Sequence, residues 1–230
     1  MKVSVLIPTR DRPGFLQKAV ASVLAQTHDD LELLIVNDGR DPLPEFSDPR
    51  LRTLSSAGAG AVPARNIAVE NAQGEVIAWL DDDDQWTDRS FLKDALDAIQ
   101  QGADFVFADG RLVFSDGSAP QAYSRSADAA TLAHDNTILI SAIAYRAALH
   151  WQLGLFDQSL PFYCDWDWYL RVARSGARLH HLARPVVDIL IHNRNTSGDS
   201  NAASRRENLD RLCGKHGLGH IPLKTHQDLA

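Results

Sequence analysis

Short, mostly apolar runs alternate with segments of helical periodicity along the first half of the chain. The helical segments carry start and stop signals, with Pro13 and Pro63 near two starts and Gly74 after one stop. Near-continuous apolar strands separated by helices are typical of an α/β fold with a mainly parallel central sheet flanked by helices. Strands are predicted at 3–8, 31–36, 51–54, 76–80 and 105–108, and helices at 11–26, 64–72 and 90–101.

The second half of the chain has a less regular pattern. Residues 119–136 are polar and predict a loop, and a helix is expected at 165–174. Two short strands, 178–182 and 186–191, follow, and then a polar helix at 202–215. The polar segment 195–203 is predicted to be a flexible lid, and the segment after Gly217 is predicted to be mobile.

Polar residues follow three of the predicted strands, at positions 9–11, 37–39 and 81–84. Because parallel strands present their carboxyl ends at one edge of a sheet, these residues should share one rim. The last group is four consecutive aspartates, whose mutual repulsion a divalent cation with oxygen ligands would relieve. An acidic turn that caps the next helix is the alternative reading. The combined rim suits a nucleotide diphosphate held through a cation.

The composition limits the classes of protein to which the chain can belong. The chain has 230 residues, 44% hydrophobic and 23% charged, which is ordinary for a globular protein. No apolar run approaches the roughly 20 residues of a membrane span, and the N-terminus lacks the pattern of a signal peptide. Cys164 and Cys213 lie far apart and suggest neither a disulfide framework nor a zinc site. We therefore expect a reduced, cytoplasmic protein.

The net charge of −7 is unevenly distributed. Residues 1–110 hold ten Lys and Arg against nineteen Asp and Glu. Such an acidic half argues against nucleic-acid binding and fits a half that holds a metal ion. The terminal helix mixes both signs of charge, which indicates a solvated helix with at most peripheral membrane contact.

Four segments carry a family resemblance: VSVLIPTRDRP, LLIVNDG, PARNIAVENAQGEVIAWLDDDD and GLFDQSLPFYCDWDWYLRVARSG. Over residues 1–195 the chain resembles the inverting, non-processive glycosyltransferases of family 2, which have the GT-A fold. The resemblance implies transfer of one sugar from a nucleotide-diphosphate sugar, usually a UDP-sugar, to a carbohydrate or lipid-linked acceptor in surface-glycan synthesis. The glutamine-arginine-tryptophan signature of processive synthases is absent, which favours transfer of a single sugar.

The same resemblance implies an organisation and a donor site. Residues 1–110 would bind the donor, 111–195 would form the acceptor-binding and catalytic half of the same domain, and 196–230 would form a flexible loop and a C-terminal helix. A Mn²⁺ or Mg²⁺ ion would be bound by Asp83 and Asp81 of the DxD motif and by His192. The nucleotide would be contacted by Pro8, Thr9, Arg10, Asp38, Arg65, Asp81 and Asp82.

Transfer also needs a base to take the proton of the acceptor hydroxyl. Asp165 matches the second acid of the family's acidic pair, which implies that it is the base, whereas Cys164 replaces the first acid. Asp167 is the second candidate, and an N-cap role for Asp165 is the structural alternative.

Two other functions stay open at this point. A sugar-nucleotide pyrophosphorylase would need a Gly-rich phosphate loop, and none follows the first predicted strand. A non-catalytic nucleotide-sugar-binding protein would keep the fold without the reaction. An Asp165→Asn variant separates this last class from an enzyme, because only an enzyme has a transfer to lose.

Overall fold

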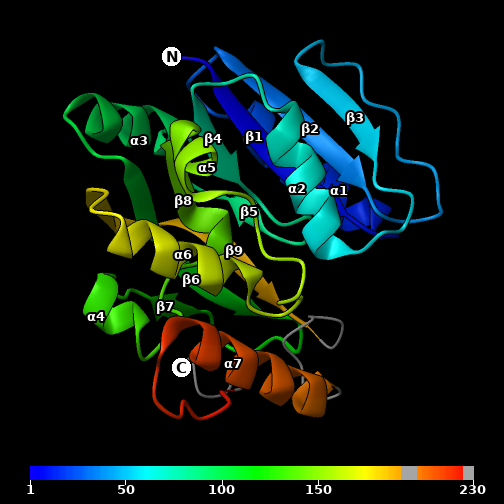
Figure 1. Ribbon diagram of the computed structural model, residues 1–230. Coiled ribbons are helices and arrows are strands. Elements are labelled where there is room, and N and C mark those ends of the chain that lie inside the picture. Colours follow the sequence, from blue (N-terminus) through cyan, green and yellow to red (C-terminus); the bar gives the residue numbers. More distant parts are fainter. Residues whose placement is uncertain (193–200, 225–230) are drawn as a thin grey trace.

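The computed structural model describes residues 1–192 and 201–224. They form a nine-stranded sheet in the order β3-β2-β1-β4-β8-β6-β9-β5, with β7 paired to β6 (Figure 1). The strands are β1 (Val3–Thr9), β2 (Leu31–Asn37), β3 (Leu51–Ser55), β4 (Val76–Trp79), β5 (Gln85–Trp86), β6 (Phe105–Phe114), β7 (Gln121–Tyr123), β8 (Ile143–Arg146) and β9 (Leu179–Ile191).

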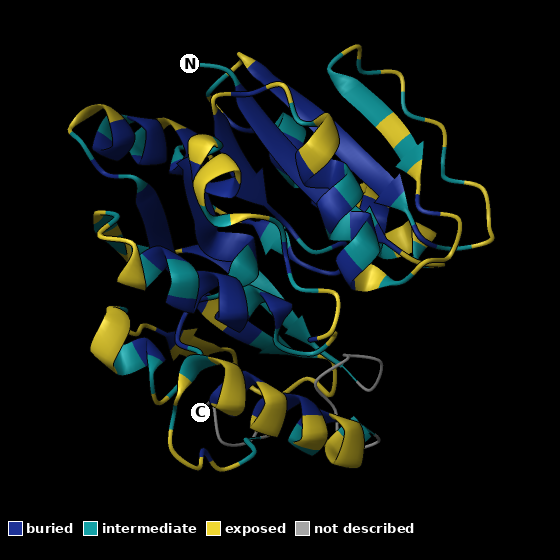
Figure 2. Ribbon diagram, in the orientation of Figure 1, coloured by how far each residue is buried: buried dark blue, intermediate teal, exposed yellow. Residues whose placement is uncertain are grey.

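Helices cover both faces of this sheet. Apolar side chains of α1 and α3 form one core with the sheet, and those of α2, α5, α6 and α7 form the other. Figure 2 shows the strands largely buried and the outer faces of the helices exposed. The helices are α1 (Pro13–Leu24), α2 (Ala61–Asn71), α3 (Phe91–Gln100), α4 (Ala129–Leu132), α5 (Ala148–Leu153), α6 (Cys164–Arg174) and α7 (Ala202–His216), with a 3₁₀ turn η1 (Ile140–Ala142).

The sheet is mixed, so the prediction of a mainly parallel sheet holds only for its first part. Strands β3, β2, β1 and β4 are parallel, as expected from the strand–helix alternation. Strand β8 then runs antiparallel to both β4 and β6, whereas β9 is parallel to β6. The short β8 lies outside the predicted strands.

Strands β6 and β9 are longer than predicted, because a β-bulge lets both continue through residues that usually end a strand. The register shifts on either side of Asp109, which pairs with Pro185. Proline is tolerated in a strand at such a bulge. Gly110 follows, where a Cβ atom would lie only 3.2 Å from the Val187 carbonyl oxygen. The predicted strands at 178–182 and 186–191 are therefore one strand.

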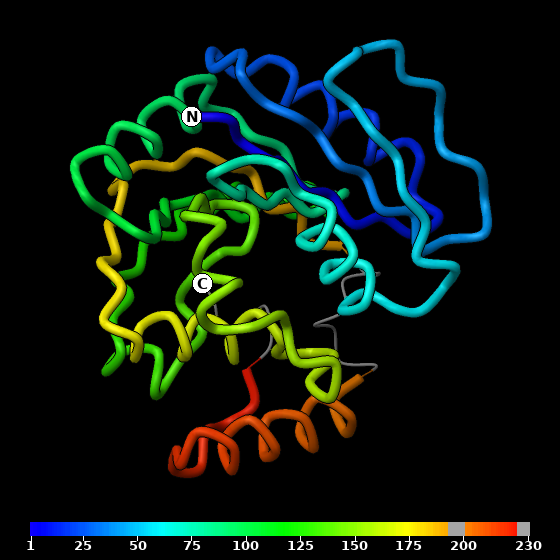
Figure 3. Tube along the Cα trace, turned by 45° about the horizontal axis from the view of Figure 1, so that its top comes forward, coloured from blue at the N-terminus to red at the C-terminus, as the bar shows by residue number. Residues whose placement is uncertain are grey.

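Two further predictions about the second half of the chain need correction. The segment 119–136 is not only a loop, since it contains β7 and α4. Residues 218–224 turn back toward the body of the chain, and Ile221 is buried there (Figure 3), whereas residues 225–230 lie outside the described residues. The predicted lid at 195–203 falls largely outside the described residues. Within the described ranges, no helix is long and apolar enough to cross a membrane.

Candidate active site

A cavity of about 670 Å³ opens at the carboxyl ends of β1, β2 and β4. The start of α6 and residues of the segment 221–224 also line it. The predicted convergence of the three polar segments on one rim is therefore confirmed. The predicted site residues among its lining are Pro8, Thr9, Arg10, Asp38, Arg65, Asp81, Asp82, Asp83 and Asp165.

The four aspartates form a turn rather than the end of a strand. Strand β4 ends at Trp79, and the Asp84 N–H donates to the Asp81 carbonyl oxygen at 3.1 Å. All four residues line the cavity. Asp81 and Asp83 therefore both face the cavity, but the turn and not the alternation of side chains along a strand places them there, because the strand ends at Trp79.

Each end of this turn has its own partners. The Asp81 carboxylate accepts a hydrogen bond from Arg65 at 2.6 Å, and Asp82 accepts one from the Thr9 hydroxyl at 2.6 Å. Asp84 accepts from the Ser141 hydroxyl at 2.6 Å and from a backbone N–H of β9 at 3.1 Å. The turn is thus fixed to β1, α2, η1 and β9, which lie far apart in the sequence.

Burial and mutual repulsion favour the protonated forms of Asp81, Asp82 and Asp84. Burial raises the pKa of Asp82 to about 6, although the hydrogen bond from Thr9 opposes the change. Burial and the charges of Asp81 and Asp83 raise the pKa of Asp84 well above its usual range. Burial also raises the pKa of Asp81, against the opposing charge of Arg65. A cluster with these properties would gain free energy from a further cation.

Asp83 and His192 could supply part of a metal site. His192 Nε2 lies 3.0 Å from Asp83 Oδ2, although His192 lies beside the cavity lining rather than in it. Across residues 1–192 and 201–224, no group of three or more His, Cys, Asp or Glu side chains forms a complete metal site. A carboxylate and an imidazole suit Mn²⁺, and Mg²⁺ also commonly takes one or two carboxylates with phosphate oxygens completing its shell. The residues present fit a cation shared with a diphosphate.

Asp38 lies at the far end of the rim, after β2. Its Oδ1 accepts hydrogen bonds from the Ser56 hydroxyl at 2.5 Å and from the Gly60 N–H at 2.8 Å. Gly60 has a φ of 110°, a backbone conformation that favours glycine. Arg10 forms an ion pair with Asp38 at 3.7 Å, and its side chain is 67% exposed. An acceptor carboxylate and an accessible guanidinium are therefore available for a nucleotide here.

Asp165 enters the cavity from the first turn of α6. Its Oδ2 accepts a hydrogen bond from Asn136 Nδ2 at 3.1 Å. Tyr163 is the N-cap residue of the helix, so the N-cap reading of Asp165 is wrong. Burial raises the pKa of Asp165, although a backbone N–H, Arg65 and Asn136 oppose the change. A carboxylate with a raised pKa in a cavity is suited to accepting a proton.

Cys164 stands beside this carboxylate, at the cavity wall. Burial raises the pKa of its thiol to about 12, so the side chain is neutral, unlike the acid that the resemblance leads one to expect. Nε of Arg65 is buried and has no hydrogen-bond partner. The guanidinium of Arg65 is instead paired with Asp81 at 2.6 Å.

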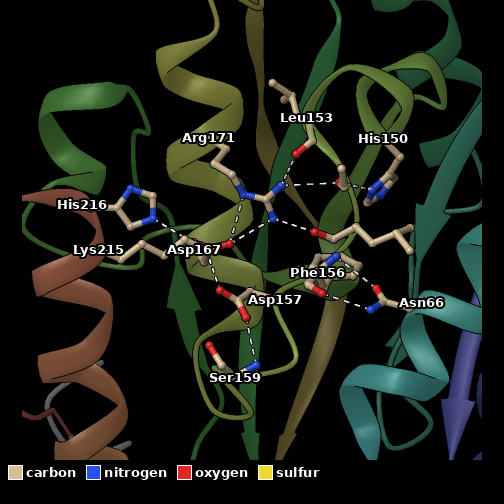
Figure 4. Close-up of polar contacts among 12 residues, drawn as sticks. Asn66, His150, Leu153, Phe156, Asp157, Ser159, Asp167, Arg171, Lys215 and His216 are labelled. Atoms are coloured by element: carbon tan, nitrogen blue, oxygen red, sulfur yellow. Dashed lines mark hydrogen bonds and ion pairs between the residues drawn. The ribbon is translucent and has the colours of Figure 1, made fainter.

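Asp167 is not placed to act as a base. Its side chain is fully buried and lies outside the cavity lining. Figure 4 shows it surrounded by Arg171, Lys215 and His216, at distances of 2.9, 2.7 and 2.8 Å. Asp167 therefore joins α6 to α7, and the prediction of Asp167 as the second candidate base is wrong.

Sequence reasoning missed several polar contributors to the cavity, among them Arg12, Asp135, Asn136 and Lys224. Arg12 directly follows the polar residues 9–11 at the end of β1. In the sequence, only its position before Pro13 indicated that it belongs to the site. Asn136 lies in a segment predicted as loop, where nothing marks one amide among other polar residues. Lys224, from the segment predicted to be mobile, reaches Asp135 at 2.5 Å, and both line the cavity.

Comparisons with known proteins agree with this architecture. The family model for glycosyl transferase family 2 matches residues 4–151. The uncharacterized glycosyltransferase YwdF of Bacillus subtilis is 32% identical over 98% of this chain and 88% of its own length. The chondroitin synthase of Pasteurella multocida is 30% identical over 85% of this chain, which spans only 21% of that synthase. The chain belongs to glycosyl transferase family 2.

Solved structures share the fold. Staphylococcus aureus TarS 1–349 in complex with UDP-GlcNAc superposes with a TM-score of 0.74 at 18% identity, over 94% of this chain and 66% of that one. The mannosyltransferase PcManGT from Pyrobaculum calidifontis, in complex with GDP-Man and Mn²⁺, gives 0.70 at 18% identity, over 99% and 67%. At these identities the likeness establishes a GT-A fold and nothing about the ligand of this chain.

Proposed function

We propose that this chain is a metal-dependent, inverting glycosyltransferase that moves one sugar from a UDP-sugar to a hydroxyl of a carbohydrate or lipid-linked acceptor. The observation that carries the proposal is the single cavity that joins the acidic rim of the sheet to Asp165. The donor-binding residues and the base must lie no further apart than the length of the transferred sugar. This cavity holds candidates for both.

The rim residues bind the donor in this proposal. Asp38 and the segment 8–10 hold the nucleoside, while Arg65, Asp81 and Asp82 hold the ribose and the diphosphate. Asp83 and His192, with Asp81, hold a Mn²⁺ or Mg²⁺ ion. When bound, that ion stabilises the negative charge that develops on the leaving diphosphate.

Asp165 acts as the base. Asn136 holds Oδ2 of its carboxylate at 3.1 Å, and Asp165 lines the cavity from which the acceptor hydroxyl would approach. As the acceptor oxygen forms its bond to the anomeric carbon, the bond from that carbon to the phosphate oxygen breaks and the hydroxyl proton passes to Asp165. Attack from the side opposite the leaving group inverts the configuration at the anomeric carbon.

The uridine and the product class rest on family relationships. TarS 1–349 is known in complexes with UDP-GlcNAc and with UDP, whereas PcManGT is in complex with GDP-Man. Relatives named as putative teichuronic acid and colanic acid biosynthesis glycosyltransferases point to a surface polysaccharide. UDP-sugars are therefore the first donors to test, with GDP-mannose as the comparison.

The test is release of UDP from a panel of UDP-sugars mixed with simple glycoside acceptors in Mn²⁺. We expect acceptor-dependent release with at least one donor, loss of release in EDTA, and loss of release in Asp165→Asn with donor binding retained. Full activity of Asp165→Asn would show that Asp165 is not the base. Donor binding without any release in the wild type would instead indicate a non-catalytic member of the family.

A further inference from the structure

Arg12 occupies the position where a cation on Asp83 would bind. Its Nη1 lies 2.7 Å from Asp83 Oδ2 and 3.3 Å from Asp82 Oδ1. His192 Nε2 lies 3.0 Å from the same Asp83 oxygen. Two nitrogen atoms therefore share one carboxylate oxygen, and both belong to side chains that are largely buried.

The start of α1 holds both of these partners. Arg12 directly precedes the helix, and Phe15 follows one turn later on the same side. The Phe15 ring stacks on the His192 ring with their centroids 5.5 Å apart and 1° between the planes. The start of α1 thus places Arg12 beside Asp83 directly and supports His192 through Phe15.

The two partners differ in what they do when a metal ion arrives. A neutral imidazole has a lone pair and can become a ligand, so His192 can turn its contact with Asp83 into shared coordination. A guanidinium has only donors and keeps its charge, so Arg12 can neither coordinate the ion nor remain beside it without repulsion. Of the two partners of Asp83, Arg12 is the one that has to leave.

The contact of Arg12 with Asp82 and its place in the cavity lining indicate where its side chain moves. Asp82 is held in place by the Thr9 hydroxyl at 2.6 Å and still accepts from Arg12, so the side chain can pivot about Asp82. Arg12 also lines the cavity. Its planar set of N–H donors matches the oxygens of a diphosphate, which a cation on Asp83 would bring beside it.

We propose that Arg12 is a further donor-binding residue, which exchanges Asp83 for the diphosphate of the donor when a divalent cation binds to Asp83. This inference rests on the proposed function, because it needs a nucleoside diphosphate in the cavity. It makes binding of metal and nucleotide interdependent: without metal, Arg12 covers Asp83, and without nucleotide, the displaced guanidinium has lost a carboxylate partner.

The Arg12→Gln variant tests the exchange through two binding measurements that should change in opposite directions. Free Mn²⁺, counted by electron paramagnetic resonance, should fall at lower metal concentrations than in the wild type, because the competing cation is gone. Calorimetry at saturating Mn²⁺ should show UDP binding weakened about tenfold or more, the usual size for a lost charge-assisted hydrogen bond.

Other roles for Arg12 give other results. A residue that only supports the fold would weaken both ligands on removal, and a simple competitor of the metal would strengthen both. Either pattern overturns the proposal, as does a variant that binds Mn²⁺ no better than the wild type. Arg40→Gln is the matched control, since it removes one exposed positive charge after β2 without contact to the aspartates, and it should change neither affinity.

The failure of this inference is distinguishable from failure of the proposed function. Wild-type protein that binds no UDP in Mn²⁺ contradicts the donor site itself. Wild-type protein that binds UDP normally, with Arg12→Gln equal to it, leaves the donor site in place and removes only the role of Arg12.

Discussion

Helix α6 joins two acidic regions that differ in how their charges are balanced. On one side, Asp165 faces a cavity whose lining also includes four consecutive aspartates. On the other side, Asp167 and Asp157 are surrounded by cations from α6 and α7, with Lys215 contacting both acids at 2.7 and 2.6 Å (Figure 4). Both regions contain aspartates, and Asp165 and Asp167 lie in the same turn of α6. The aspartates nevertheless have different roles in the two regions.

The pKa values of the two regions move in opposite directions. Burial raises the pKa of Asp167, but hydrogen bonds from His216 and Lys215 and the charge of Arg171 outweigh it and leave the value lowered. The same balance lowers the pKa of Asp157 to about 2. In the cavity, burial dominates and raises the pKa of Asp165. A group of acids without enough fixed cations, open to a cavity, is the arrangement expected of a binding site.

The largest expected effect is on catalysis. Asp165→Asn should lower kcat by between about 100-fold and 10,000-fold, the usual contribution of a general base, because Asn cannot accept the proton. UDP affinity and thermal stability should stay close to wild type. If the variant lost unfolding free energy together with kcat, Asp165 would have a structural role like that of Asp167. The distinction between the two regions would then not hold.

Asp167→Asn should lower the stability of the protein and leave kcat nearly unchanged. Removing the charge leaves Lys215, His216 and Arg171 without their shared carboxylate, which should cost about 2–4 kcal/mol of unfolding free energy in urea denaturation. The kcat of the remaining folded protein should change little, because Asp167 lies outside the cavity lining. A variant of wild-type stability would contradict the role given to this residue in joining α6 to α7.

The stability difference between the wild type and Asp167→Asn should depend on pH. The lowered native pKa means that the Asp167 carboxylate contributes stability fully above its unfolded value of about 3.9, and this contribution is lost as the pH falls through the native pKa. Urea denaturation at a series of pH values should therefore show the two proteins converging below about pH 4. A constant difference down to pH 3 would show that the charge is not the cause.

The smallest expected effect is at Asn136. Asn136→Ala removes one hydrogen bond to the Asp165 carboxylate, which should lower kcat about tenfold and leave UDP affinity unchanged. Steady-state kinetics and calorimetry measure the two quantities. A fall in UDP affinity equal to the fall in kcat would make Asn136 a donor contact instead of a positioning residue for Asp165.

The part of the site on the first four parallel strands could be predicted from the sequence. Apolar runs that end in polar residues specify both the strands and the rim where they end, so Thr9, Asp38 and the four aspartates were expected together and lie together. This inference needs only local patterns and the geometry of parallel sheets.

The second half could not be predicted in the same way, because its elements are defined by partners distant in sequence. Asp165 and Asp167 are both acids in one helical turn, and what distinguishes them is His216, 49 residues beyond Asp167. Strand β9 accommodates Pro185 because it bulges there, where its extra residues lie opposite Ala108, Asp109 and Gly110 of β6. The buried position of Ile221 likewise depends on the return of the chain after α7.

We propose that the rim aspartates form a metal-dependent nucleotide site. The most direct test is calorimetric titration of the wild type and of Asp83→Asn with UDP, and separately with GDP, in Mn²⁺ and again in EDTA. We predict that UDP binds in Mn²⁺, binds much more weakly in EDTA, and loses affinity in Asp83→Asn. Equal UDP binding with and without metal, unaffected by Asp83→Asn, would contradict the claim.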